Sequence, residues 1–238
     1  MGIPFTTDQF FDGFRQYNEA VWPAQWFLGA LGVITVVVAL RHGARAARWV
    51  NLVLALLWYW MAIAYHLAIF ADLSRLGLAF ALAFVVQGAM FSWLAVRRAP
   101  ASYVPRSLAT TGIGAVLIIY AIVVYPMLGY LWGHRYPASP TFGVPCPTTI
   151  YTLGLLVWGS ATVPRRFYLI PLAWAVVGTS AAVNLGVTED FGLAVAAALT
   201  IGLLVARRSG TGRRESGADH RPAIGVRPSA RSKALSRR

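Results

Sequence analysis

Residues 75–98 read RLGLAFALAFVVQGAMFSWLAVRR, an apolar run between Arg75 and the pair Arg97-Arg98. The run has the roughly 20 residues that an α-helix needs to cross the hydrocarbon core of a bilayer. One arginine flanks its first end, whereas two flank its second end and Arg106 follows closely. Because cytoplasmic loops retain Lys and Arg, this asymmetry predicts that the Arg97 end lies in the cytoplasm.

The same pattern of apolar run and charged gap recurs along the chain. The runs long enough to cross a bilayer are 22–40, 49–70, 76–96, 107–132, 147–163, 167–185 and 191–206. Backbone polar groups in lipid must pair within their own segment, and no barrel-type alternation is visible, so the runs are predicted to be helices. The predicted fold class is an all-α membrane protein with seven transmembrane helices in a domain over 22–206.

The gaps between these runs alternate in charge, and this alternation predicts the orientation. The gaps after the first, third and fifth runs are basic, as is the tail that follows residue 206. We therefore expect the N-terminus outside and the C-terminus in the cytoplasm. Six acidic residues then fall on the outer side: Asp8, Asp12, Glu19, Asp72, Glu189 and Asp190.

Composition supports a membrane location. The 238 residues are 58% hydrophobic and 12% charged, and the mean hydropathy is +0.60, which is too apolar for an ordinary soluble domain. The net charge of +13 is concentrated in the tail and in three short loops. A basic inner face suits anionic lipid headgroups. No basic patch with interleaved aromatic residues occurs, so nucleic acid is not an expected partner.

The segments at the two ends differ from the spans. Within residues 1–21, Thr6 and Gln9 fit a capping box, and Phe5 can pack on Phe10. Apolar residues at helical spacing predict an amphipathic helix on the outer surface, an anchor that could also cover an outer cavity. The tail over 207–238 is rich in Arg, Ser, Gly and Pro and is predicted to be a disordered basic cytoplasmic segment.

No residue pattern points to catalysis. Every charged residue falls at or beyond the end of a predicted span, which counts against a charge relay or a proton-coupled carrier. The lone lysine, Lys233, lies in the tail, so no span can form a retinal Schiff base. There is no metalloprotease His pair, no phosphate-binding glycine loop and no pair of intramembrane aspartates. A non-enzymatic protein is therefore expected. Gln87, midway along its span, is expected to bond to another helix.

Polar and proline-rich features gather on the predicted outer side. The longest gap, 133–147, contains three prolines in its second half and is expected to fold over the mouth of the bundle. We predict an outer-facing pocket for a small molecule, in a permease or a sensor. The candidate lining is Asn18, Gln25, Tyr59, His66, Cys146, Thr149 and Asn184.

Two alternative functions are compatible with the same residues. His66 and Cys146 supply imidazole and thiolate, which suit a metal such as copper or zinc, or a haem, in a redox protein. The chain could instead be an assembly subunit whose ligand is another membrane protein.

Three segments carry a resemblance to a known family: 17–25 (YNEAVWPAQ), the pair Tyr65-His66, and 140–149 (PTFGVPCPTT). With these segments the chain, from Met1 to about Ala206, resembles an uncharacterised bacterial integral-membrane family that is defined by a domain of unknown function. Members are sometimes labelled transporter permeases. The resemblance implies the cytoplasmic membrane of a bacterium and assigns no substrate or catalytic residue.

Overall fold

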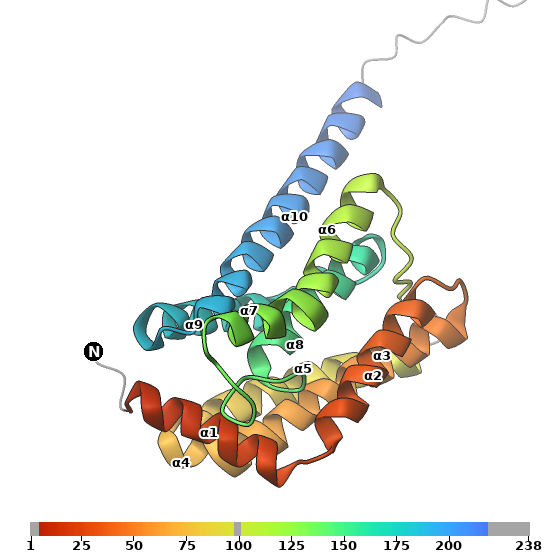
Figure 1. The fold of residues 1–238 in the computed structure, drawn as a ribbon. Coiled ribbons are helices and arrows are strands. Elements are labelled where there is room, and N and C mark those ends of the chain that lie inside the picture. Colours follow the sequence, from red (N-terminus) through yellow and green to blue (C-terminus); the bar gives the residue numbers. More distant parts are fainter. Residues whose placement is uncertain (1–4, 98–100, 219–238) are drawn as a thin grey trace, which may run out of the picture. The chain divides into compact units, whose positions relative to one another are not determined.

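The structure is a computed structural model that describes residues 5–97 and 101–218 (Figure 1). Within these ranges the protein is helical and has no strand, which confirms the all-α prediction. The helical elements are α1 (Thr7–Ala20), α2 (Ala24–Ala39), α3 (Ala44–Trp60), η1 (Met61–Phe70), α4 (Ala71–Leu73), α5 (Leu76–Val96), α6 (Leu108–Ile119), η2 (Tyr120–Val124), α7 (Tyr125–Leu131), α8 (Pro145–Trp158), η3 (Gly159–Ala161), η4 (Arg165–Tyr168), α9 (Leu169–Leu185), η5 (Thr188–Asp190) and α10 (Phe191–Ala218).

Five helices of the described chain are long and apolar enough to cross a membrane. They are Ala44–Leu73, Leu76–Val96, Leu108–Leu131, Arg165–Leu185 and Thr188–Arg207. The pair α1 and α2, bent by 86° at the break between them, provides a sixth if it is counted as one span. α5 has the predicted bounds. The predicted runs 22–40 and 147–163 form the shorter helices α2, of 16 residues, and α8, of 14 residues.

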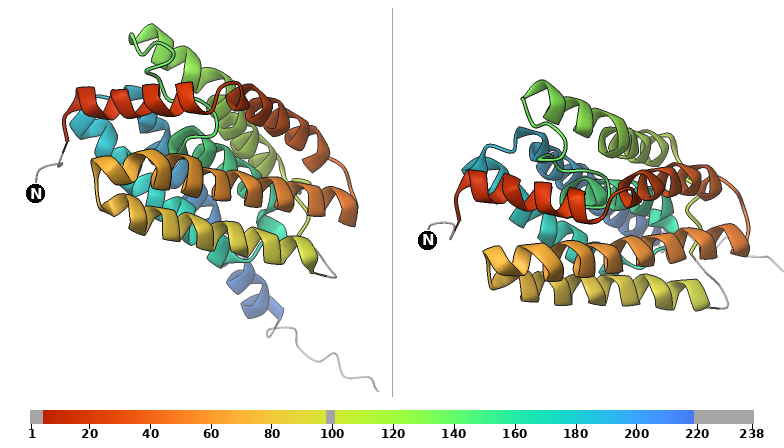
Figure 2. Two further views of the ribbon diagram at one scale, coloured as in Figure 1. Left: turned by 90° about the horizontal axis from the view of Figure 1, so that it is seen from below. Right: turned by 60° about the horizontal axis from the view of Figure 1, so that its bottom comes forward.

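α8 lies at the centre of the fold, and all of its residues are buried. It packs against α6, η2 and α9. The approach to α6 is close because glycines face each other: a Cβ at Gly114 would lie 2.8 Å from the Gly154 carbonyl oxygen and would overlap the Trp158 ring. Small residues allow this kind of close helix packing in membranes. Figure 2 shows α3 and α5 side by side, as their packing requires.

The loops of the compact unit 1–203 gather at two ends. At one end, α1 contacts the 133–144 loop through Asn18, whose side-chain Nδ2 donates to the carbonyl oxygens of Pro137 and Ser139. Leu185 and Val187 pack into the same cluster as the apolar face of α1. We call this end, which carries α1, the α1 end.

The opposite end of the unit is joined by other loop contacts. The Tyr103 hydroxyl donates to Oδ1 of Asn51 over 2.7 Å, and the Thr162 hydroxyl donates to the Ser102 carbonyl oxygen. Burial raises the pKa of Tyr103 well above its ordinary value, so this hydroxyl stays a donor. Consecutive loops therefore alternate between the two ends, as expected for antiparallel neighbouring helices.

α1 has the predicted local structure. Thr6 and Gln9 exchange both hydrogen bonds of the capping box, and the Phe5 ring stacks on Phe10 at a centroid distance of 5.8 Å. Phe14 and Tyr17 are buried against Tyr65 of η1, with ring centroids 5.7 Å apart in each pair. The acidic face of α1 is mostly exposed. The helix thus buries one side on the bundle, as its amphipathic pattern predicts.

The disordered tail was predicted to begin at residue 207, but the last helix extends beyond this position. α10 continues to Ala218, so 207–218 are helical, and residues 219–238 of the predicted tail lie outside the described residues. An apolar helix has already nucleated before this point, and adding residues such as Arg and Glu to it costs little. The chain divides into two compact units, Met1–Leu203 and Leu204–Arg238. All the features described below lie in the first unit.

Candidate functional site

The site is built on two adjacent carboxyl groups that begin the last helix. Glu189 and Asp190 form η5 just before α10, and both side chains are 0% exposed. The turn that brings them inward begins at Gly186, which ends α9 in the left-handed conformation (φ 73°) that favours glycine. The sequence places these residues in an outer gap. In the structure α7, α9 and the 133–144 loop pack around this gap, so both side chains are buried.

Asp190 has a defined hydrogen-bond environment on one side only. The Tyr125 hydroxyl donates to Oδ1 over 2.5 Å. The Cys146 thiol, at the start of α8, is a second side-chain hydrogen-bond partner of the same carboxyl group. Within the described chain, no donor has the distance and angle of a hydrogen bond to Oδ2 of Asp190. A buried acceptor without a donor costs free energy, and Oε2 of Glu189 likewise has no donor within the described residues.

Glu189 faces a different set of groups. Its Oε1 lies 2.8 Å from Nδ1 of His134, and its main-chain carbonyl oxygen accepts from the Tyr120 hydroxyl over 2.7 Å. A Cβ at Gly129 would lie 3.0 Å from Oε1, so a glycine in α7 leaves room for this carboxyl group. Within residues 5–97 and 101–218, Glu189 has a basic partner, His134, whereas Asp190 has no basic partner.

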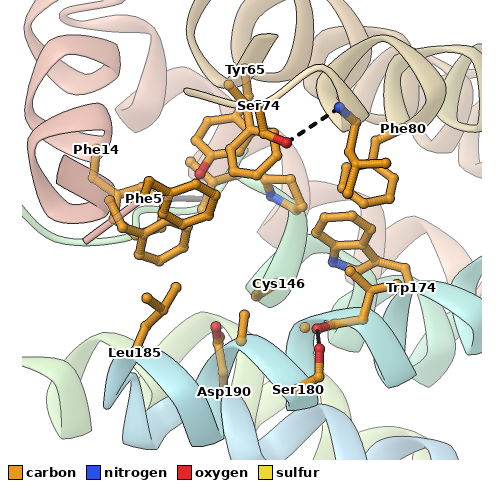
Figure 3. A pocket seen from close by; sticks show the side chains of 18 residues that line it. Phe5, Phe14, Tyr65, Ser74, Phe80, Cys146, Trp174, Ser180, Leu185 and Asp190 are labelled. Carbon is orange, nitrogen blue, oxygen red and sulfur yellow. Dashed lines mark hydrogen bonds between the residues drawn. The ribbon is translucent and has the colours of Figure 1, made fainter. Parts of the chain in front are cut away.

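Asp190 lines a mostly apolar cavity to which seven aromatic side chains contribute, and we call it the aromatic cavity (Figure 3). Its volume is about 150 Å³. Cys146, Asp190 and Trp174 bring polar groups to it, and Phe14 and Tyr65 lie across from them. Its lining residues are Phe5, Phe10, Phe14, Tyr65, Phe70, Ser74, Leu76, Phe80, Val144, Pro145, Cys146, Trp174, Val177, Gly178, Ser180, Ala181, Leu185 and Asp190.

A second cavity, of about 590 Å³, lies under the 133–144 loop, and we call it the loop cavity. Glu189, His134 and Tyr125 line it, together with Gln25 of α2. Tyr125 therefore reaches the loop cavity while its hydroxyl bonds to Asp190, which lines the aromatic cavity. The carboxyl pair lies between the two cavities, so the sequence-based argument against a charge relay no longer holds.

His66 lies beside the aromatic cavity but is not among its lining residues. It is 0% exposed, and its ring packs at 4.6 Å from Phe84 and 5.2 Å from Trp174, measured between centroids. Neither ring nitrogen has a hydrogen-bond partner within the described residues. His66 and Tyr65 belong to η1, a π-helix, and a second π-helix, η2, precedes Tyr125. π-Helices are rare in proteins, and those that occur often lie at functional sites.

The predicted lining residues do not meet in one pocket. Cys146 lines the aromatic cavity and Gln25 the loop cavity. Asn18 is fully buried and fastens the 133–144 loop, since its Oδ1 also accepts from the Thr141 hydroxyl. Gln25 donates to the main-chain oxygen of Asn18 over 2.7 Å.

The other predicted residues have structural positions. The Tyr59 hydroxyl lies 3.2 Å from the Ser92 hydroxyl, on neither cavity. Thr149 is buried in α8, without a partner for its hydroxyl among the described residues. Asn184 is exposed and bonds to the Ser180 carbonyl oxygen of its own helix. As expected, Gln87 donates to another segment, at the carbonyl oxygen of Phe167.

The predicted metal ligands, His66 and Cys146, lie on different helical segments of the described chain, η1 and α8. Among the described residues, no three His, Cys, Asp or Glu side chains form a group that could hold a metal ion. His66 and Cys146 both interact with Trp174. The Cys146 thiol has Asp190 and Trp174 as side-chain hydrogen-bond partners and interacts electrostatically with Glu189. His66 is not among these groups.

Five residues of the site are absent from the predicted lining: Tyr125, His134, Trp174, Glu189 and Asp190. The sequence does show a Glu-Asp pair directly before an apolar run, with a glycine three residues earlier. That signal could have indicated a chain reversal that turns the pair inward. The aromatic residues gave no comparable signal, because the chain contains many of them.

The fold and site define an all-helical protein with several helices apolar enough to cross a membrane and a buried carboxyl pair between two cavities. A family model matches residues 7–215, and the chain belongs to this family, a family of unknown function (DUF6064). The membership confirms the resemblance inferred from the three segments. No curated protein and no solved structure matches the chain.

Proposed function

We propose that this protein is a multi-pass membrane protein that binds a small molecule in the aromatic cavity, as a permease or a sensor. The observation that carries the proposal is the chemistry of that cavity: apolar walls with Asp190, Cys146 and Trp174 at one side. Small-molecule sites typically combine apolar walls with a few placed polar groups. A cavity of about 150 Å³ in a protein core is large enough to bind benzene.

The proposed membrane arrangement has seven spans, with α2 and α8 crossing alongside the five longer helices. α8 is short for a span, but its burial among other helices removes the need to match the bilayer thickness. The alternation of loops between two ends supports this path. The arginine-rich loops support a cytoplasmic position for the end opposite α1, and therefore an outer position for the α1 end.

In this arrangement the aromatic cavity opens toward the outer side of a bacterial cytoplasmic membrane. α1 covers it through Phe10 and Phe14, and Val144 of the 133–144 loop also lines it. α1 is thus both a surface anchor and a cover. A ligand from outside would enter by displacement of the first part of α1, where Phe10 and Phe14 pack on the bundle, while the hydrogen bonds of Asn18 hold the other end of the helix.

A cavity-filling variant tests the proposal. Ala181→Phe places a ring in the aromatic cavity, whereas Ala173→Phe puts the same ring on an exposed position of the same helix. A library of small amines, alcohols, acids and sugars is screened by thermal unfolding of the purified protein. A ligand present at 100 times its Kd stabilises by about 2.7 kcal/mol. We expect at least one compound to raise the midpoint of the wild type and of Ala173→Phe, but not of Ala181→Phe.

The proposal fails if no compound stabilises the wild type, or if both variants respond alike. Uptake of a stabilising compound into proteoliposomes then separates a permease, which accumulates it, from a sensor, which does not.

A further inference from the structure

We propose that the aromatic cavity recognises a small organic cation, an alkyl- or arylammonium, with Asp190 as its counter-ion. This inference rests on the proposed function and names the ligand class of the same site.

The charge of the site points to a cation. Asp190 is 0% exposed, and no Arg, Lys or His in the described ranges lies within salt-bridge distance of its carboxyl group. The neighbouring Glu189 has His134 as its partner. The Tyr125 hydroxyl satisfies Oδ1 of Asp190 and leaves Oδ2 for a donor from the cavity. A nearby positive charge stabilises the ionised form of a buried carboxyl group, and the ligand would supply that charge.

The walls of the cavity suit a cation as well. Six aromatic side chains surround the space next to Asp190: Phe10, Phe14, Tyr65, Phe70, Phe80 and Trp174. The faces of such rings attract ammonium groups, and the attraction is stronger when the cation is desolvated. An anion would be repelled by the carboxyl pair, because Asp190 and Glu189 are consecutive residues.

The volume limits the size of the ligand. About 150 Å³ accommodates one aromatic ring or a compact alkyl group with a single ammonium head. A polyamine or a peptide does not fit in this space. The chemistry therefore points to a monoamine or a small quaternary ammonium ion.

Matched pairs of probes separate charge from shape. The purified full-length protein is incubated with radiolabelled benzylamine, and bound probe is counted by scintillation proximity. Unlabelled benzyl alcohol then competes as the neutral isostere, and tetramethylammonium is compared with tert-butanol. We expect saturable benzylamine binding, with each ammonium compound competing at least about ten-fold more strongly than its alcohol, since an ion pair in a desolvated site is worth more than a neutral hydrogen bond.

Two variants locate the preference at Asp190. Asp190→Asn keeps the shape and removes the charge, and it should reduce the ammonium-to-alcohol ratio to near one. Asp72→Asn makes the same change at an exposed carboxyl group that does not line the aromatic cavity, and it should retain the ratio. If Asp190→Asn does not fold, the competition on the wild-type protein still decides the question.

The outcomes are distinct. Equal competition by the ammonium compounds and their alcohols overturns the cation and leaves the proposed small-molecule site standing. Retention of the preference in Asp190→Asn, or its equal loss in Asp72→Asn, overturns the role of Asp190. Failure of every probe to bind, while neutral compounds from the screen stabilise the protein, overturns the ligand class alone. Failure of both experiments removes the proposed function as well.

Discussion

Glu189 and Asp190 are neighbours in the chain, yet their side chains meet different partners. Glu189 lies against His134 at the loop cavity, and Asp190 lies against Tyr125 and Cys146 at the aromatic cavity. Both residues lie in η5, just before α10, and so are near the positive end of a helix dipole, which favours negative charge there. Within the described chain Glu189 has a basic partner, His134, and Asp190 has none, although one carboxylate oxygen of each residue is without a donor there.

The His134–Glu189 pair should contribute to stability. Replacing His134 with alanine leaves Oε1 of Glu189 buried without its donor, which costs about 1–2 kcal/mol. We expect His134→Ala to lower the thermal midpoint of the purified protein, as followed by tryptophan fluorescence. His42→Ala, at an exposed loop position, is the control and should leave the midpoint unchanged. Equal midpoints for the two variants would show that the pair does not stabilise the fold.

Residue roles were only partly predictable from the sequence. Of the residues predicted to line a pocket, Asn18, Gln25, His66, Cys146 and Thr149 are buried, whereas Asn184 is exposed. Their grouping did not follow from the sequence, because it depends on contacts between distant segments. Asn18 meets Pro137 across 119 positions of the chain, and no local pattern encodes that meeting. The burial of the carboxyl pair was not predicted, because the position of a span boundary in the sequence does not show which other segments pack over it.

At the scale of elements, the crossing of α6 and α8 depends on glycine. A Cβ at Gly114 would meet the Gly154 carbonyl oxygen and the Trp158 ring, whereas a Cβ at Gly112 has no atom within 4 Å in the described structure. We expect Gly114→Ala to destabilise the protein by about 1–3 kcal/mol through overpacking. Gly112→Ala, on the same helix, should be neutral or slightly stabilising, because alanine is the better helix former. Thermal unfolding of the two variants checks this, and a reversed order would refute the close approach.

α1 should control access to the aromatic cavity. Thr6→Ala removes the capping box, which costs the helix about 1 kcal/mol and raises local opening roughly five-fold. Cys146 is the only cysteine in the chain and is 8% exposed, so its labelling by N-ethylmaleimide reports this opening. We expect faster labelling in Thr6→Ala.

The control for this measurement is Ser107→Ala, which removes the equivalent capping box of α6. Ser107 does not line the aromatic cavity, so its loss should not change the labelling rate of Cys146. A similar acceleration in both variants would mean that labelling follows general loosening rather than movement of α1.

Elements were more predictable than residues. Hydropathy located every helix of the bundle, and the capping pattern located the start of α1, because both signals are local. The π-helices η1 and η2 were not anticipated. Their extra residue per turn is stabilised by packing between helices, and the sequence of one segment does not specify it.

At the scale of the whole molecule, the proposed orientation has a direct test. A green fluorescent protein fused after Arg238 should fluoresce in a bacterial host, and alkaline phosphatase at the same position should be inactive. The reason is that the C-terminal end is rich in arginine, and arginine-rich segments are retained in the cytoplasm. Truncation after Arg135, in the gap between the fourth and fifth spans, serves as the control and should give the opposite result. Phosphatase activity after Arg238 would reverse the orientation and move the aromatic cavity to the inner side.

The enclosure of α8 also bears on how the protein is made. With only 14 residues, three threonines and two prolines, α8 is a poor substrate for insertion by the translocon on its own. The neighbours that cover it include α9, which is synthesised later. In the proposed seven-span arrangement, stable insertion of α8 therefore requires the segments that follow it, and we expect nascent chains that stop shortly after Trp158 to be preferred targets of membrane quality-control proteases.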